Sequence, residues 1–148
     1  MYRPDPGFRE AAPEVNEAAR RTLDAAIEVH RHLGPGYGES VYENALALEL
    51  GLRGMLFERQ ACFRVDYKGQ EVGEGRMDLL VERLVVVELK SVDRFTEVHV
   101  AQALAYLKAT RLSLALLINF KVPLLMRGVQ RVVLNRPLAP GTRGAQEA

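Results

Sequence analysis

Cysteine is nearly absent from this chain, because Cys62 is the only one among 148 residues. A single thiol excludes an internal disulfide framework and a cysteine-rich zinc site. Long apolar runs are also missing, and none approaches the roughly 18 residues that a membrane-spanning helix needs. The polar stretch at residues 1–5 is not typical of a secretory signal. These absences lead us to expect a cytoplasmic protein that does not associate with membranes.

Charge is nearly balanced but unevenly spread along the chain, with a formal net charge of +1. Residues 1–100 carry 13 Lys and Arg against 18 Asp and Glu, whereas residues 101–148 carry seven Lys and Arg against one Glu. Such a skew can mark a surface that meets a polyanion, although ordinary solvation explains it equally well. The basic residues of this C-terminal third are Lys108, Arg111, Lys121, Arg127, Arg131, Arg136 and Arg143.

The hydrophobic pattern predicts one α/β domain with a mixed β-sheet flanked by helices. A chain of 148 residues suits a single domain with a sizeable core. We expect helices over 14–33 and 39–53, a third helix from an N-cap at Thr96 to residue 110, and strands over 56–67, 70–81, 84–90, 113–120 and 129–134. The domain is expected to span residues 14–136, between a flexible N-terminus (1–13) and a flexible tail (137–148).

Two carboxylates and one amine fall on adjacent apolar strands. The strands over 70–81 and 84–90 are separated by a short polar break that we interpret as a hairpin turn. A register that places residue 81 opposite residue 85 also places Asp78 opposite Glu88, with Cβ atoms about 5 Å apart. Strand alternation then puts Lys90 on the same face as Glu88.

Such a cluster lowers the stability of the fold, so its presence suggests a chemical role. Asp78 and Glu88 would repel each other in low dielectric, so one takes up a proton or the pair binds a cation. Mg²⁺ prefers carboxylate and carbonyl oxygens, and Lys90 could orient or help deprotonate an attacking water for phosphodiester hydrolysis. The alternative is an ordinary salt-bridge cluster on a solvated sheet face. Apolar residues on both faces of these strands favour the functional interpretation.

The second predicted helix carries an acidic residue at its start. Glu39 shares a stripe with Tyr42, Leu46 and Leu50, so we expect it to project from a partly buried face. Its alternative role is to stabilise the helix dipole, and Glu43, one turn later, could substitute for it. The other apolar stripe of this helix consists of Val41, Ala45, Leu48 and Leu52.

The third predicted helix places Gln102 and Tyr106 on one side, four residues apart. An inward amide needs a hydrogen-bond partner, which could be a water, a phosphate or the end of a strand. His30 and His32 point to different sides of the first helix and are a poor chelating pair. Cys62 is expected to be a small core residue.

The segment Gly36-Tyr37-Gly38-Glu39-Ser40-Val41-Tyr42 has the form G-x-x-E-x-x-Y. Combined with Arg76-Met77-Asp78, Glu88-Leu89-Lys90, and Gln102 with Tyr106, it resembles the bacterial GxxExxY protein family, which is assigned to the PD-(D/E)XK nuclease superfamily. The resemblance runs from about residue 15 to residue 135. It implies a restriction-endonuclease-like core of a helix, three antiparallel strands, a helix and a further strand. One departure is Met77, which stands where a proline precedes the aspartate in the family pattern.

The resemblance also implies a metal site and its catalytic residues. Asp78 and Glu88 would bind Mg²⁺ or Mn²⁺ with the aid of the backbone carbonyl of Leu89. Lys90 would assist the attacking water, and Glu39 would complete or orient the metal shell.

Four further residues are expected to support the site. By resemblance, Gln102 and Tyr106 would stabilise it and contact nucleic acid, and Tyr42 belongs to the motif itself. Arg76 could contact a phosphate or pair with Glu74, and the sequence alone does not distinguish these two alternatives.

These features predict a metal-dependent nuclease that hydrolyses the phosphodiester backbone of nucleic acid, with DNA as the expected substrate. The alternative is a non-catalytic module that binds nucleic acid or a protein partner on a nuclease scaffold. A homo-oligomer or a subunit of a larger assembly would also suit a small domain without a separate reading domain.

Overall fold

The computed structural model describes residues 11–134. Its elements are α1 (Pro13–Leu33), α2 (Glu39–Leu52), β1 (Phe57–Tyr67), β2 (Gln70–Val81), β3 (Val85–Lys90), α3 (Glu97–Thr110), β4 (Leu114–Asn119), the short 3-10 helix η1 (Leu125–Gly128) and β5 (Val129–Val133). The predicted helices and strands are confirmed, with ends that differ by one residue at most, whereas η1 was not predicted. The expected flexible ends and the domain boundary at residue 136 lie largely outside the described residues.

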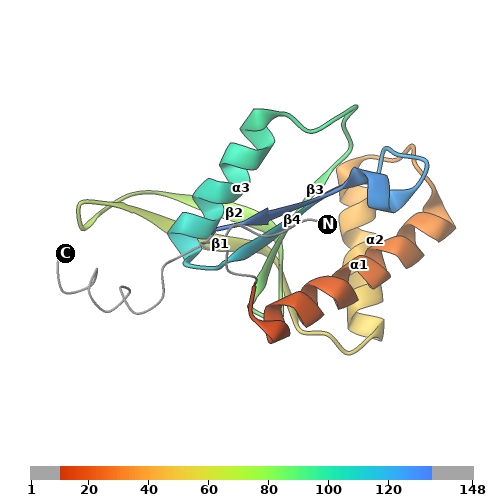
Figure 1. Ribbon diagram of the computed structural model, residues 1–148, viewed down its shortest axis with the longest axis horizontal. Helices are drawn as coiled ribbons and strands as arrows, with labels where there is room; N and C mark the ends of the chain where they lie inside the picture. Colours follow the sequence, from red (N-terminus) through yellow and green to blue (C-terminus); the bar gives the residue numbers. More distant parts are fainter. Residues whose placement is uncertain (1–10, 135–148) are drawn as a thin grey trace, which may run out of the picture.

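The five strands form one mixed sheet in the order β1-β2-β3-β4-β5. The first three strands make an antiparallel meander, and β4 pairs antiparallel with β5. Between these parts, β3 and β4 run parallel and are connected through α3 (Figure 1). The mixed sheet that the sequence predicted is therefore confirmed.

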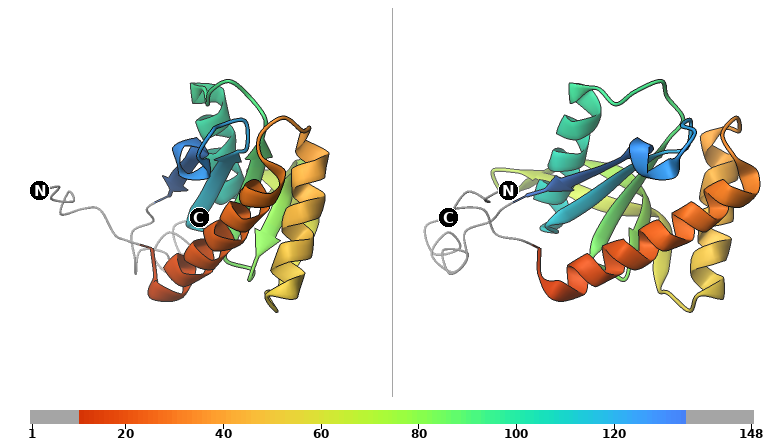
Figure 2. Two further views of the ribbon diagram at one scale, coloured as in Figure 1. Left: turned by 90° about the vertical axis from the view of Figure 1, so that its right-hand side faces the viewer. Right: turned by 45° about the vertical axis from the view of Figure 1, so that its right-hand side comes forward.

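The helices form layers on both faces of the sheet. α1 and α2 lie together on one face and α3 covers the other (Figure 2). Small buried residues of α1, such as Ala25 and Ala26, allow that helix to approach the strands closely. The strand residues alternate between the two layers, because Leu116 joins the core under α1 and α2 whereas Leu117 joins the core under α3. Both faces of the central sheet are thus covered.

Burial differs sharply between the centre and one end of the sheet. All six residues of β4 are buried, as expected for a strand with helices on both faces. Residues 64–74, at the outer end of the β1–β2 hairpin, are all exposed, and this end projects away from the helices (Figure 1). The core that positions a site therefore lies under the three helices and not along the hairpin.

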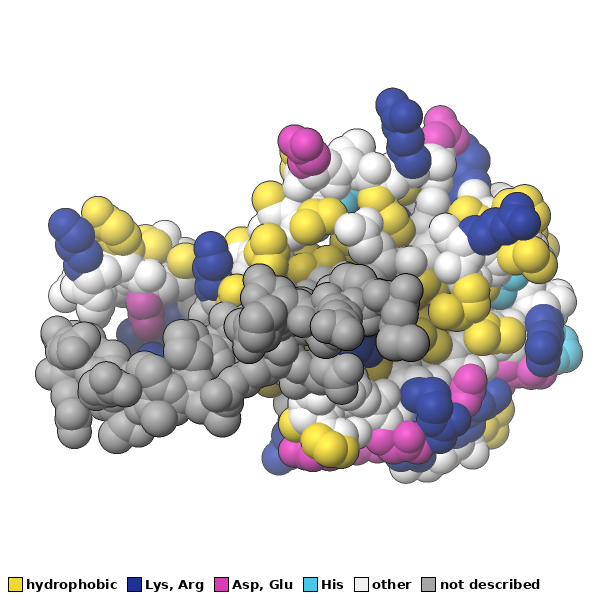
Figure 3. All heavy atoms as spheres, in the orientation of Figure 1, with side chains coloured by type: hydrophobic (Ala, Val, Ile, Leu, Met, Phe, Trp, Pro, Cys, Tyr) yellow, Lys and Arg dark blue, Asp and Glu magenta, His cyan; other side chains and the backbone are white. Residues whose placement is uncertain are grey.

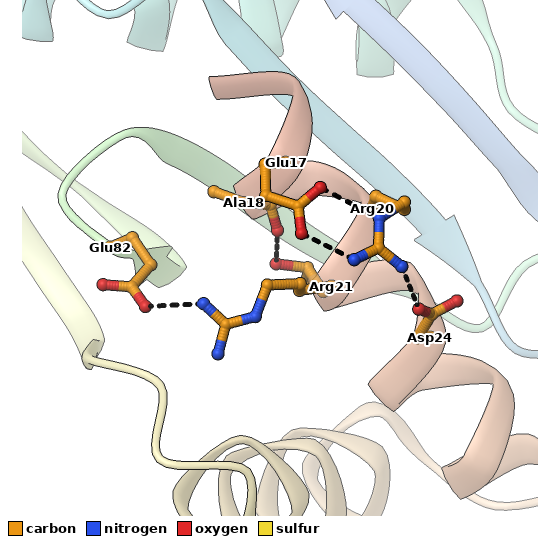
Figure 4. Close-up of polar contacts among 7 residues, drawn as sticks. Glu17, Ala18, Arg20, Arg21, Asp24 and Glu82 are labelled. Carbon is orange, nitrogen blue, oxygen red and sulfur yellow. Dashed lines mark hydrogen bonds and ion pairs between the residues drawn. The ribbon is translucent and has the colours of Figure 1, made fainter. Parts of the chain in front are cut away.

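The turn between β2 and β3 is the predicted hairpin turn. Glu82 and Arg83 both adopt positive φ, +54° and +58°, which matches the twist that a tight hairpin needs. Arg21 of α1 forms an ion pair with Glu82 at 3.5 Å, beside a separate surface network in which Arg20 contacts Glu17 and Asp24 (Figure 4). The first helix is thereby connected to the turn that sets the β2–β3 register.

The burial expectation for Cys62 is wrong. Cys62 is exposed, because it lies on β1 at the edge of the sheet. On α2, Val41, Leu48 and Leu52 are 38%, 66% and 74% exposed, so of the other apolar stripe only Ala45 packs against the core. Helical spacing identifies both stripes equally well but does not show which one faces the sheet.

Within residues 101–134, the cations of the C-terminal third are spread over α3 and its C-cap, the segment after β4, η1 and β5. Lys121 pairs with Asp93 at 2.7 Å, and Arg131 hydrogen-bonds Asn16 on α1. On the face shown in Figure 3, Lys and Arg side chains are scattered among Asp and Glu. Arg136 and Arg143 lie outside the described residues. Among the helices described, none is long and apolar enough to cross a membrane.

Candidate functional site

The strands β2 and β3 separate at the two predicted acidic residues. Residue 81 pairs with residue 85, as predicted, and the ladder continues only as far as Leu79 opposite Val87. Beyond this point side chains replace the backbone acceptors. The Asp78 N–H donates to Glu88 Oε1 at 3.0 Å, and the Leu89 N–H donates to Asp78 Oδ2 at 2.8 Å. Asp78 and Glu88 therefore meet at a fork in the sheet.

Glu88 is the buried member of this pair, with a relative exposure of 4%. Burial raises the pKa of its carboxyl group to about 8, and the nearby charge of Asp78 adds to the increase. The hydrogen bond from the Asp78 N–H and the charge of the Lys90 ammonium group lower the pKa of Glu88, but by less than burial and Asp78 raise it. At neutral pH this pair therefore holds a proton on Glu88 unless a cation takes its place.

Lys90 ends β3 beside this pair and is half-buried. The chain that follows it is fixed by Asn119, which faces Lys90 across the parallel ladder. The Asn119 side chain donates to the Val92 carbonyl at 2.7 Å and accepts the Val92 N–H at 3.2 Å. Sequence reasoning missed Asn119, although a polar residue at the end of an apolar strand was a signal.

Glu39 and Asp78 share a cleft of about 490 Å³. Its lining residues are Glu39, Ser40, Glu43, Gln60, Arg76, Asp78 and Leu89. Glu39 is exposed as the first residue of α2, so the predicted partial burial is wrong even though the residue lines the cleft. α2 and the open fork thus form opposite parts of one concave site.

Tyr42 supports the turn that precedes Glu39 from inside the core. Its hydroxyl group donates to the Gly34 carbonyl at 2.6 Å and accepts the Tyr37 N–H at 3.2 Å. Its ring is fully buried and stacks on Phe120 with a centroid distance of 4.3 Å. The motif tyrosine therefore fixes the start of α2 and has no surface for nucleic acid.

Tyr106 reaches the carboxylate pair from α3. Burial raises the pKa of the Tyr106 hydroxyl group, and the charges of Glu88 and Asp78 contribute to the same effect, so the phenol lies beside them. Gln102 lies beside the Tyr106 hydroxyl group but is exposed, so the predicted inward position of its amide is wrong. Tyr106 is thus brought to the fork on the face opposite α2, and Gln102 is not shown to contact the carboxylates.

The Tyr106 ring also contacts β1. Phe63 lies against it with a centroid distance of 4.8 Å and an interplanar angle of 60°. Across the ladder Phe63 faces Gly75, where an added Cβ atom would lie 2.3 Å from the Phe63 ring. Any larger residue at this position would require the phenyl ring to move, because the ring occupies the space of the added atom.

Arg76 is exposed at the rim of the cleft. Glu74 faces Arg64 across the β1–β2 ladder. Among the residues described, no carboxylate forms an ion pair with Arg76. Its guanidinium group is therefore available to an anion in the cleft.

The donor set fits a hard divalent cation held by few protein ligands. Within the described residues, no three or more His, Cys, Asp and Glu side chains are grouped closely enough to hold a metal ion by themselves. Asp78 and Glu88 supply two carboxylates, one of them buried with a raised pKa. Mg²⁺ typically binds one or two carboxylates and keeps several waters. A cation would also relieve the repulsion that now requires a proton.

Comparisons with known proteins give one family match. A family model described as the PD-(D/E)XK nuclease superfamily matches residues 16–132. One similar solved structure, titled "Crystal structure of SSO0001", is 17% identical, with a TM-score of 0.45 and coverage of 91% of this chain and 68% of that chain. Comparison with curated proteins found no match. The matched range contains every residue described above for the fork and its cleft.

Proposed function

Because this chain belongs to the PD-(D/E)XK nuclease superfamily, we propose that it hydrolyses phosphodiester bonds of nucleic acid with the aid of a divalent cation, and that its substrate is DNA. The observation that carries the proposal is the fork at Asp78 and Glu88. A buried carboxyl group with a pKa near 8, directly beside a second carboxylate, is a costly arrangement that a cation would stabilise.

Asp78, Glu88 and the Leu89 carbonyl would hold Mg²⁺ or Mn²⁺. Such an ion supplies charge stabilisation at the scissile phosphate and lowers the pKa of water. The protein's own part is to keep both carboxylates in place through the two reciprocal hydrogen bonds to backbone N–H groups. Glu39 would complete or orient the ligand set from the other side of the cleft.

Lys90 would orient or help deprotonate the attacking water from the end of β3. Its position two residues after Glu88 at the end of β3, together with its lowering effect on the pKa of Glu88, supports this role. Arg76 would bind a phosphate of the substrate at the rim. Gln102 and Tyr106 would support the pair from α3 and contact nucleic acid.

Within the superfamily, we assign the chain to the GxxExxY family. The sequence from Gly36 to Tyr42 supports this assignment, since Glu39 lines the cleft and Tyr42 anchors the turn before it.

The test is cleavage of single- and double-stranded DNA and RNA with Mg²⁺ or Mn²⁺ by the wild-type protein, Asp78→Ala and Lys90→Ala. We expect cleavage that needs the cation and is lost in both variants. Equal activity in the variants would reveal a contaminating nuclease, and a wild-type protein without cleavage of any of these substrates would refute the proposal.

A second candidate is a non-catalytic module that binds nucleic acid or a partner protein on the same scaffold. It is favoured by one observation, that the Arg76 guanidinium group at the rim of the cleft forms no ion pair with a described residue and is available to bind a phosphate without hydrolysis. Calorimetric titration of Mn²⁺ into the wild-type protein and Glu88→Gln separates the candidates, because only a metal-dependent site loses affinity in the variant. A mass measurement in solution tests the expected homo-oligomer or partner.

A further inference from the structure

The backbone of β1 is distorted directly opposite Asp78. Arg59 pairs with Leu79 and Ala61 pairs with Met77, but Gln60, which lies between them and faces Asp78, has no partner in the ladder. Gln60 adopts a φ of +49°, in the left-handed region that non-glycine residues seldom occupy. Because Gln60 also lines the cleft, this distortion lies within the site.

The distorted residue is held by α2. The Gln60 amide Nε2 donates to Glu43 Oε1 at 2.5 Å. The other carboxylate oxygen of Glu43 accepts two hydrogen bonds from Arg59, at 3.2 Å from Nε and 2.8 Å from Nη2. Arg59 also hydrogen-bonds Asn44, the next residue on the helix. Both oxygens of Glu43 are therefore occupied, and it is not free to substitute for Glu39 as the sequence suggested.

This network joins the two sides of the cleft. Glu43 lies one helical turn after Glu39, and Gln60 lies across from Asp78. We propose that Glu43, Arg59 and Gln60 form a positioning clamp that fixes the first turn of α2, and with it Glu39, relative to Asp78. The clamp rests on the proposed function for its catalytic consequence, but its mechanical role does not depend on cleavage.

The chain offers a matched control on the same helix. Glu49 pairs with Arg53 at 2.9 Å, and its side chain is 22% exposed against 15% for Glu43. Unlike Glu43, Glu49 does not line the cleft. Glu43→Ala and Glu49→Ala therefore each remove one carboxylate–arginine pair from α2, but only the first removes a connection to β1.

Hydrogen exchange of the full chain without metal tests the clamp independently of activity. We expect Glu43→Ala to increase exchange at residues 37–46 and 57–63 by at least tenfold relative to Glu49→Ala, at similar Tm. The exchanged pair, Glu43→Arg with Arg59→Glu, is expected to restore protection, which a general loss of folding would not allow. Equal exchange in Glu43→Ala and Glu49→Ala would overturn the clamp.

Kinetics then tests whether the clamp positions the site. We expect Glu43→Ala to lower kcat at least tenfold with KM within twofold of the wild-type value, and Glu49→Ala to change neither. Increased exchange with an unchanged kcat would overturn the positioning role. A wild-type protein without cleavage refutes the proposed function alone, because the exchange experiment still decides whether the clamp exists.

Discussion

The two edges of β3 differ in how far they pair with the neighbouring strands, and this difference explains where the acidic residues meet. Toward β4, all six residues Val85–Lys90 pair in an unbroken parallel ladder with Leu114–Asn119. Toward β2, only Val85, Val86 and Val87 are paired, and carboxylates serve the backbone N–H groups beyond them. One strand thus combines a closed edge that stabilises the fold with an open edge that brings acidic groups together.

We expect the largest loss of cleavage from a substitution at the open edge of β3, where Asp78 and Glu88 meet. Asp78→Asn keeps an oxygen that can accept the Leu89 N–H but removes the charge. We expect Mn²⁺-dependent cleavage to fall by about 10²–10³-fold or more with little change in Tm, as for loss of one group that stabilises transition-state charge. Single-turnover assays and thermal unfolding provide both measurements. Full activity in Asp78→Asn would place the chemistry elsewhere.

A core substitution at the closed edge should affect stability and not chemistry. Leu116 is fully buried and pairs with both Val87 and Arg131. We expect Leu116→Ala to lower the free energy of unfolding by about 2–5 kcal/mol, because it leaves a cavity in the core. Urea denaturation measures this loss. Mn²⁺ affinity of the folded variant should equal that of the wild type, and a weakened affinity would show that the two edges are not independent.

The pH dependence of stability should report on Glu88. Its folded pKa of about 8 lies above the ordinary value of 4.5, so the folded state binds more protons between these values than the unfolded state does. Stability from this group is complete below about pH 4.5 and is lost as pH rises toward 8. The loss is on the order of a few kcal/mol.

Thermal unfolding of the wild-type protein and Glu88→Gln across this range checks that expectation. The variant should show a flatter dependence and a higher Tm at pH 8 in the absence of metal. Mn²⁺ should stabilise the wild-type protein increasingly as pH rises, because the cation competes with the proton. Parallel pH profiles for the two proteins would contradict the assignment.

We expect the smallest change in stability and cleavage from a substitution on the surface of α1, far from both edges of β3. Arg20 forms two ion pairs on the surface of α1, with Glu17 and Asp24, and its side chain is 61% exposed (Figure 4). Solvent screens such pairs, so Arg20→Ala should leave Tm within about 2 °C of the wild type and cleavage unchanged. A larger change in either measurement would show that the Arg20 pairs contribute more than solvent-screened surface contacts do.

Much of this architecture follows from local sequence patterns. Periodicity predicted the order of helices and strands, and the length of the break before Val85 predicted the β2–β3 register. Thr96 is also the N-cap of α3, as predicted, and its N–H donates to His99 Nδ1 at 3.1 Å. Each of these features depends on residues that are neighbours in the chain.

What the sequence did not predict depends on residues far apart in the chain. Gln60 and Glu43 are 17 positions apart, and Asn119 hydrogen-bonds Val92 across 27. The exposure of Cys62 and Leu48 depends on which elements cover an edge or a helix face. The motif spacing predicted candidate site residues, of which Glu39, Asp78 and Leu89 line one cleft, but it gave no indication of the contacts that hold them.

The packing of Phe63 over Gly75 has a consequence for how substitutions spread. Any side chain at position 75 must push aside a ring that in turn supports the Tyr106 phenol. A position with no contact to the carboxylates can therefore impair them through two intermediate rings, those of Phe63 and Tyr106. Random mutagenesis selected for loss of function should recover replacements of this glycine beside those of the acidic residues themselves.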